Sequence, residues 1–449
     1  MAIDDDPTAA GRSTGKEASN MTTPSSVPVS ADIDASPQEW RNPRSGFLFF
    51  LGLAAIGTGM GQLVPAVLTL TLKADQLDPA NATTILSVVV AIGAVCALIA
   101  APLFGRLSDR LTWRMGRRRP LLILGAILFA IGAPFSYAAP STGLLIIAGI
   151  FTSLGAAAVT VACTAILADQ YAPDRRGAAS ALVGLSLPLG ALVGLFLANL
   201  VSGSLLAQFL LPAAVAVVGA LLLAWRLDDR VITRDEVPVL AARDFFGTFW
   251  VNPVRHPSFG WAWWSRLLIF FGIAAVQAYQ AFYLIIALGF SREAVSGAVF
   301  LSTLVLTALA LVFAPIAAKL SDRIGRRKPF VIVAAVVFAV GLVVVTFARD
   351  YPTFLIAMGI IGLGQGVYMA VDLALVSQIL PDRHNIAKDM GIMGLASSLP
   401  SSIVPAVAPA LLAIGATAAV PQNFPALFLT GAVAGLIGAA LILPIKGTK

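Results

Sequence analysis

Twelve apolar runs, most of them 20 or more residues long, follow one another from residue 46 onward and are separated by short polar breaks. A helix of about 20 apolar residues matches the thickness of the hydrocarbon core of a bilayer. Of the 449 residues, 58% are hydrophobic and only 12% are charged, whereas soluble domains are about a quarter charged. The sequence therefore predicts an all-α membrane protein with 12 transmembrane helices. The predicted spans are 46–72, 81–104, 120–139, 143–168, 178–200, 204–225, 263–288, 294–318, 329–348, 352–379, 391–414 and 425–444.

The breaks between the apolar runs suggest a division into parts. Residues 1–45 are polar and contain no apolar core of a signal peptide, so we predict a disordered cytoplasmic N-terminal tail. The longest later break, 226–262, divides the spans six and six. We predict an N-terminal six-helix bundle at 46–225, a cytoplasmic central loop at 226–262, and a C-terminal six-helix bundle at 263–449.

Lysine and arginine predict the orientation. With an internal N-terminus, 26 of the 30 basic residues fall in the tails and loops on the inner side, whereas Lys73, Arg292 and Arg349 fall outside and Arg266 lies within a span. Cytoplasmic loops of membrane proteins carry such an excess. We therefore predict a multi-pass protein of the cell membrane with both termini in the cytoplasm. The net charge of +7 has the same origin, so nucleic-acid binding is not expected.

A basic loop occurs twice. Residues 105–120 read Gly-Arg-Leu-Ser-Asp-Arg-Leu-Thr-Trp-Arg-Met-Gly-Arg-Arg-Arg-Pro, and residues 321–329 read Ser-Asp-Arg-Ile-Gly-Arg-Arg-Lys-Pro. Ala-Pro-Asp-Arg-Arg at 172–176 matches Leu-Pro-Asp-Arg-His at 380–384, and Leu-Ser-Leu-Pro at 185–188 matches Ser-Ser-Leu-Pro at 397–400. The offsets are 213, 208 and 212 residues in the same order. Two pseudo-symmetric six-helix bundles, related by an axis along the membrane normal, would place a substrate site between them near the midplane.

The repeated Asp-Arg…Gly-Arg-Arg loop with six plus six spans resembles the major facilitator superfamily over residues 46–444. The five residues between Arg110 and Gly116, and Ala-Ile-Leu-Ala-Asp at 165–169, are similar to the sucrose/proton symporter (glycoside-transporter) group. In the plant sucrose carriers of that group, an arginine implicated in sugar and proton coupling precedes the second motif, where this chain has Thr164.

The basic loops suggest a gate. Gly105 would allow helices to approach closely, Asp109 could contact a helix N-terminus, and the arginines could pair with Asp169. The resemblance implies that such contacts close the cytoplasmic side. The alternative is a topology signal made of positive charge alone. The predicted gating residues are Gly105, Asp109, Arg110, Gly116, Arg117, Arg118, Asp169, Asp322, Arg323, Gly325 and Arg326.

Asp372 is the clearest charged residue deep in a span, and such residues are usually functional. Gln365 and Tyr368 precede it by seven and four residues, so the three share a helix face. A carboxylate among apolar residues can take up and release a proton near neutral pH, because burial disfavours its charged form. We predict a proton-coupling or substrate-contacting role. The alternative is a structural carboxylate paired with another helix, for example with Arg266.

Polar stripes on spans 1, 4 and 7 predict further substrate contacts, and the resemblance implies that spans 1, 4, 7 and 10 line the cavity. Each stripe alone could equally bind helix to helix. Together, amides, hydroxyls and a tyrosine suit a sugar or polyol better than a lipophilic cation. The residues are Thr58 and Gln62 in span 1, Thr164 in span 4, and Gln277, Gln280 and Tyr283 in span 7.

Catalytic and cofactor motifs are missing from the sequence. It contains no phosphate-binding loop with Lys-Ser/Thr, no His-Glu-x-x-His and no Gly-x-Ser-x-Gly, so we expect neither an enzyme nor a bound cofactor or metal. Cys96 and Cys163 lie within apolar runs and suit core packing.

The sequence therefore predicts a monomeric secondary active transporter that works by alternating access in the lipid bilayer. We expect proton-coupled uptake of a small-molecule substrate that is polar, such as a sugar or glycoside. The alternatives are a proton-driven exporter of drugs or metabolites and, from another class, a transporter-like sensor or lipid-handling membrane protein.

Overall fold

The computed structural model describes residues 46–172, 175–229, 231, 255–376, 378–379, 386–417 and 422–445. Every regular element in these ranges is a helix. The predicted N-terminal tail lies outside the described residues, as do most of the predicted central loop and the segment 380–384.

The helices follow the order of the predicted spans. In the first half they are α1 (Phe47–Val64), η1 (Pro65–Thr69), α2 (Leu70–Leu77), α3 (Ala82–Arg110), α4 (Arg119–Ala138), α5 (Thr142–Gln170), α6 (Gly177–Leu200) and α7 (Leu205–Arg226). In the second half they are α9 (Pro257–Phe282), η4 (Tyr283–Ala287), α10 (Ala294–Ile324), α11 (Lys328–Phe347), α12 (Tyr351–Val376), α13 (Ile386–Ser398), α14 (Pro400–Ala413) and α15 (Phe424–Ala440).

The described residues provide 11 helical segments that are long and apolar enough to cross a membrane. A twelfth, α15, is apolar but shorter, with 17 residues. α1, η1 and α2 form one span, and α13 with α14 form another. The predicted all-α fold with 12 helices is confirmed.

Several helices run past the predicted limits. α3 continues to Arg110 and α10 to Ile324, beyond the apolar runs that end at 104 and 318. Long basic side chains at these ends reach polar surroundings, so the helix need not stop where the apolar run stops. Pro65 lies inside the first span without breaking its helix. It begins a short π-helical segment, η1, which accommodates its missing N–H within a continuous helix.

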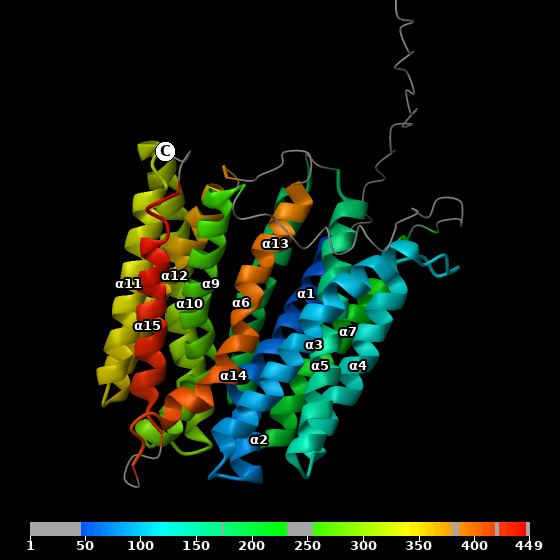
Figure 1. Cartoon of the computed structure of the whole chain (residues 1–449). Coiled ribbons are helices and arrows are strands. Elements are labelled where there is room, and N and C mark those ends of the chain that lie inside the picture. The colour runs from blue at the N-terminus through cyan, green and yellow to red at the C-terminus, as the bar shows by residue number, and fades with distance from the viewer. Residues whose placement is uncertain are drawn as a thin grey trace, which may run out of the picture. The chain divides into compact units, whose positions relative to one another are not determined.

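Each half is built around its first helix. α1 packs against α6 and α7, and α9 packs correspondingly against α14 and α15. Between the halves, α3 packs against α14 and α6 against α10. The second helix of each half thus meets the fifth span of the other, which is the pairing that a pseudo-twofold axis produces. In Figure 1, α6, α13 and α14 lie between the two groups of helices.

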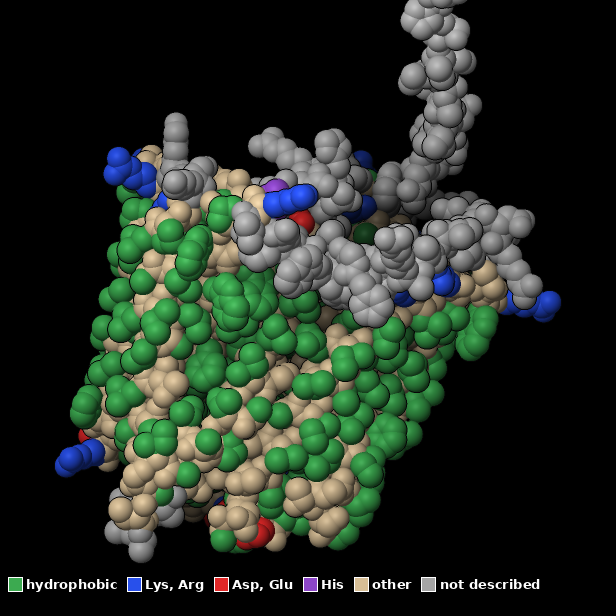
Figure 2. Space-filling view, in the orientation of Figure 1, with side chains coloured by type: hydrophobic (Ala, Val, Ile, Leu, Met, Phe, Trp, Pro, Cys, Tyr) green, Lys and Arg blue, Asp and Glu red, His purple; other side chains and the backbone are tan. Residues whose placement is uncertain are grey.

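The surface shows a broad apolar flank with basic residues mainly along one end (Figure 2). Several large apolar side chains of the spans are more than half exposed, for example Leu103, Val333 and Phe347. Exposed apolar side chains over so wide an area indicate contact with lipid. The ends of α3, α5, α7 and α10 that carry the basic loops face the same side, which we call the arginine-rich end, and the opposite side is called the distal end.

Gly190 allows α6 to lie directly on α1. A Cβ atom at Gly190 would lie 2.6 Å from the carbonyl oxygen of Ile56 and 2.7 Å from the backbone nitrogen of Met60. Both are backbone atoms, so a side chain would push the two helices apart.

We predict that Gly190→Ala destabilises the protein by about 1–3 kcal/mol, the typical cost of overpacking a core. Gly184→Ala is the matched control, because it lies on the same helix with nothing within 4 Å of its Cβ position. Thermal unfolding of the two purified variants provides the comparison. Equal unfolding midpoints would contradict the predicted close contact between α6 and α1.

Candidate functional site

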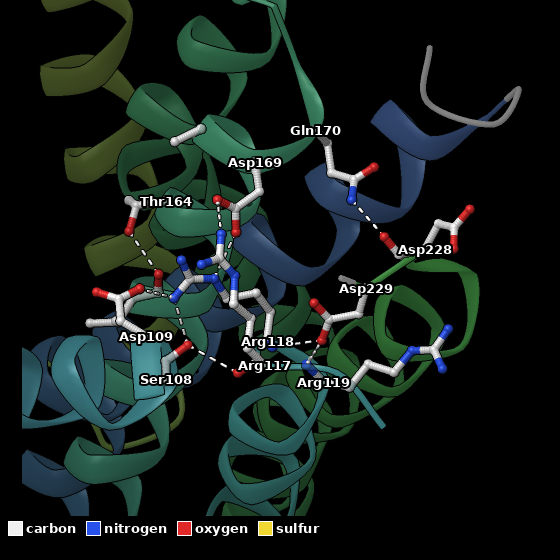
Figure 3. A network of polar contacts seen from close by, with 12 residues as sticks. Ser108, Asp109, Arg117, Arg118, Arg119, Thr164, Asp169, Gln170, Asp228 and Asp229 are labelled. Atoms are coloured by element: carbon white, nitrogen blue, oxygen red, sulfur yellow. Dashed lines mark hydrogen bonds and ion pairs between the residues drawn. The ribbon is translucent and has the colours of Figure 1, made fainter. Parts of the chain in front are cut away.

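Arg118 is the centre of a polar network at the arginine-rich end (Figure 3). It immediately precedes α4, and its Nη1 atom lies 2.8 Å from Asp109 Oδ1 and 2.7 Å from Ser108 Oγ, both on α3. Its Nε atom donates to Asp169 Oδ2 on α5 at 2.8 Å. One guanidinium thus binds two helices to the start of a third.

Arg117 strengthens the same network. Its Nη2 atom donates to Asp169 Oδ1 at 2.6 Å, so the two arginines occupy both oxygens of one carboxylate. Burial disfavours the charged form of Arg118, but the hydrogen bond and charge of Asp169, together with Asp109, outweigh it and raise the pKa of Arg118. The arginine therefore stays charged, and the expected pairing of these arginines with Asp169 is present.

Asp229 is a member of this region that the sequence analysis missed. It follows α7, and its Oδ2 atom accepts hydrogen bonds from the backbone nitrogens of Arg118 at 2.6 Å and Arg119 at 2.8 Å. A carboxylate at a helix N-terminus satisfies free N–H groups and complements the helix dipole. Gly116 has φ +90°, and a Cβ atom there would lie 2.3 Å from Asp229 Cγ. The available signal was the pair of acidic residues, 228 and 229, directly after span 6.

The second basic loop repeats part of this arrangement. Arg327 Nη2 lies 3.4 Å from Asp322 Oδ1, as Arg118 pairs with Asp109. Lys328 donates to the carbonyl of Ile445 after α15, as Arg119 donates to the carbonyl of Leu227 after α7. In place of the contact with Asp169, Arg327 donates to the backbone carbonyl of Ala374. Gly325 has φ +67° and corresponds to Gly116.

The other predicted gating residues have less specific positions. Arg110, Arg323 and Arg326 are exposed. A Cβ atom at Gly105 would lie 3.9 Å from Val161 Cγ1, an ordinary distance, so the expected close approach at Gly105 is not seen. The loop contacts described above each join parts of one half, and none of these contacts crosses between the halves.

Asp372 lies in a buried polar cluster within the second half. Its side chain is 8% exposed, and its Oδ2 atom is 3.2 Å from Arg266 Nη1 on α9. The Tyr368 hydroxyl donates to Asp372 Oδ1 at 3.1 Å. The Arg266 guanidinium also lies over the ring of Phe270, 5.6 Å from its centroid. The pairing with Arg266, which the sequence left as the alternative, is present. A role in proton coupling would require the ion pair between Arg266 and Asp372 to separate.

Two polar residues of α9 and η4 are packed within the second half. Gln280 is buried and accepts a hydrogen bond from Ser302 Oγ at 3.3 Å. The Tyr283 hydroxyl lies 2.9 Å from the carbonyl oxygen of Val345 and 2.6 Å from that of Ala348. Gln277 and Gln365, in contrast, are partly exposed. These contacts do not bring Gln280 or Tyr283 to Asp372.

The exposed residues of individual helices distinguish lipid-facing from water-facing sides. On α3, the exposed stripe is large and apolar, comprising Val95, Ile99, Leu103 and Leu107. Lipid-facing positions have this character.

A different stripe is exposed on α5 and α13. On α5 it is Thr160, Thr164 and Ala168, and on α13 it includes Gly394 and Ser398. Small and polar residues gain little from contact with lipid, so we infer that these sides face a water-accessible cavity between the halves.

Span 1 also has an exposed polar side chain. Gln62 is exposed on α1, although most of α1 is buried. Thr58 is buried, and its hydroxyl donates to the Ala54 carbonyl at 2.7 Å. Ser398 was recognised in the sequence only as part of a repeat, and the exposed Ser401 was not singled out.

An accessible polar face between two apolar bundles is useful when a solute crosses there, so the fold and site define a membrane transporter. The chain belongs to the Major Facilitator Superfamily, whose family model matches residues 45–313 and 301–449. It is accordingly a secondary transporter of small molecules and not an enzyme.

A D-xylose transporter of Levilactobacillus brevis is 29% identical over 192 residues, which are 41% of this chain and 40% of that transporter. The alignment therefore spans less than half of the relative. A D-xylose-proton symporter has a similar structure, with TM-score 0.66, 16% identity, and coverage of 90% of this chain and 99% of the other. A bacterial homologue of the human lysosomal transporter Spinster, inward-facing and occupied, gives TM-score 0.67, 14% identity, and coverage of 90% and 97%. At these identities the structures establish the fold.

We predict that Asp372→Asn or Arg266→Gln alone destabilises the protein by about 3–5 kcal/mol, because each leaves a buried charge without its partner. The double variant should recover most of this loss, since neither charge remains. Thermal unfolding of the three purified variants measures the coupling. If the two single effects simply add in the double variant, the pair is not coupled.

Proposed function

We propose that the protein takes up a small polar solute, of the sugar or glycoside type, together with protons. The observation that carries the substrate class is the accessible polar face, where Gln62, Thr160, Thr164 and Ser398 offer amide and hydroxyl groups without formal charge. Such groups suit the hydroxyls of a neutral polyol, because each can donate and accept hydrogen bonds.

The coupling proton is assigned to Asp372. Asp372 is the buried carboxylate of α12. When the helices move, its partners Arg266 and Tyr368 would separate from this carboxylate and leave it free to bind the proton. The similarity to a D-xylose transporter and the resemblance of the first basic loop to the sucrose/proton symporter group support a sugar substrate. We also propose that the arginine-rich end faces the cytoplasm, as the excess of basic residues there favours.

The basic loops are proposed to work as rigid parts of the gate. Each joins its own helices through an Asp–Arg pair, Asp109–Arg118 and Asp322–Arg327, so that each half would move as one body. A topology signal alone would need the positive charges but not these aspartates.

We expect proteoliposomes with an inward proton gradient to accumulate a labelled pentose, hexose or glycoside, and a protonophore to abolish the accumulation. Asp372→Asn should lose proton-driven accumulation but keep substrate counterflow, which also shows that the variant is folded. Asp228→Asn, an exposed residue after α7, is the control. Unchanged accumulation in Asp372→Asn would refute the proton site. Accumulation of the solute driven by an outward proton gradient would indicate a proton-driven exporter.

We expect Asp109→Asn to lower the maximal transport rate severalfold while membrane insertion stays normal. The loss removes one carboxylate from Arg118, but Asp109 is 56% exposed and Asp169 remains, so the protein should still fold. Initial rates per correctly folded molecule in proteoliposomes are the measurement. Wild-type rates would favour the simple topology signal.

A further inference from the structure

We propose that three polar contacts at the distal end form a latch that holds the two halves together and sets the resting bias of the transporter. The contacts are Ser87–Tyr279, Gln208–Ser296 and Asp75–Arg292, and we call them the distal latch. Each joins a residue of the first half to one of the second. This inference does not depend on the identity of the solute.

Ser87–Tyr279 is the innermost contact. The hydroxyls of Ser87 on α3 and Tyr279 on α9 are 2.6 Å apart, and the residues are 1% and 0% exposed. Ser87 Oγ also lies 2.6 Å from the Thr83 carbonyl oxygen and donates its hydrogen there. The Tyr279 hydroxyl is therefore the donor in the contact between the halves, and Ser87 is the partner it loses when they separate.

Gln208–Ser296 is a second buried contact. Gln208 Nε2 on α7 lies 2.9 Å from Ser296 Oγ on α10 and 3.0 Å from the Ala198 carbonyl oxygen. Both side chains are buried. Because the amide keeps its bond to Ala198 within its own half, separation costs it only the bond to Ser296.

The third contact lies at the rim. Arg292, which precedes α10, places Nη2 2.6 Å from Asp75 Oδ2 on α2. Arg292 is about half exposed, so the pair is open to water and salt. Nearby, Phe196 on α6 and Phe300 on α10 pack with ring centroids 5.5 Å apart, adding an apolar contact between the halves.

The positions of these residues explain the bias. Ser87, Gln208 and Ser296 lie within the first two turns of their helices at the distal end, and Asp75 lies in the last turn of α2. At the arginine-rich end, the loop contacts of Arg118 and Arg327 stay within one half, and the accessible stripe of α5 continues to Ala168. Opening the distal side therefore requires breaking the latch, whereas the loop contacts of Arg118 and Arg327 at the other end would stay intact.

The test measures the distal separation with spin labels on Ser141→Cys and Arg349→Cys, exposed positions near the distal ends of the two halves. The natural Cys96 and Cys163 are replaced by alanine, and distances are recorded in lipid nanodiscs by pulsed electron paramagnetic resonance. We expect a short distance to dominate. Tyr279→Phe or Ser87→Ala should raise the ratio of long to short distances by about two- to ten-fold, as the loss of one net hydrogen bond predicts.

Matched controls remove similar groups within one half. Tyr351→Phe loses a hydroxyl bond to the Ala298 carbonyl, and Ser265→Ala loses one to the Gly438 carbonyl, both inside the second half. These variants should keep the wild-type distances. If they shift the ratio as much as Tyr279→Phe does, or if Tyr279→Phe leaves it unchanged, the latch is refuted.

Asp75→Asn provides a variant that disturbs no buried packing. It should also increase the long distances, and its effect should shrink at high salt, because salt already screens the pair in the wild-type protein. If the distances in Asp75→Asn are unchanged at low salt, the pair Asp75–Arg292 is not part of the latch.

Discussion

Charged side chains within an apolar bundle must find their partners inside the protein, because lipid offers none. Arg266 meets Asp372 between α9 and α12. Lys73 is buried near the distal end and donates to the carbonyl oxygen of Tyr137 at the end of α4, where the helix dipole favours a cation. These contacts determine which helices lie together, so the few charges of this chain do more to specify packing than their number suggests.

The two halves have similar basic loops but differ at a corresponding position of α5 and α12. The pairs Asp109–Arg118 and Asp322–Arg327 lie at corresponding places, although nine residues separate the partners of the first pair and five those of the second. By the offset of 208 residues, however, Thr164 of α5 corresponds to Asp372 of α12, and the first is exposed while the second is buried in an ion pair. At this position the first half therefore has an exposed hydroxyl and the second a buried carboxylate paired with Arg266.

The spans, the repeat and the basic loops could be predicted from the sequence, because each depends on composition or spacing along the chain. The Arg266–Asp372 pair could be named only as an alternative. Ser87–Tyr279 and Gln208–Ser296 were not foreseen, since 192 and 88 residues separate the partners and an isolated serine or glutamine in a span has no distinctive pattern.

Local sequence also failed to distinguish two copies of one motif. Leu-Ser-Leu-Pro lies inside the continuous helix α6, whereas Ser-Ser-Leu-Pro falls at the junction of α13 and α14. α14 contains two more prolines, Pro405 and Pro409, which remove further backbone donors from the same span. The repeated pattern thus lies inside one helix in the first half and at a helix junction in the second.

The polar contacts differ in strength according to what must stay together during transport. Within each half, charge-assisted bonds such as Arg118–Asp169 join helices that would move as one body, and such bonds are roughly twice as strong as neutral ones. Between the halves, the distal contacts are neutral hydroxyl and amide bonds and one half-exposed ion pair. A neutral bond is worth about 0.5–1.5 kcal/mol and an exposed ion pair about 1 kcal/mol or less. Alternating access requires this order, because a contact between halves as strong as the loop networks would fix the transporter in one state.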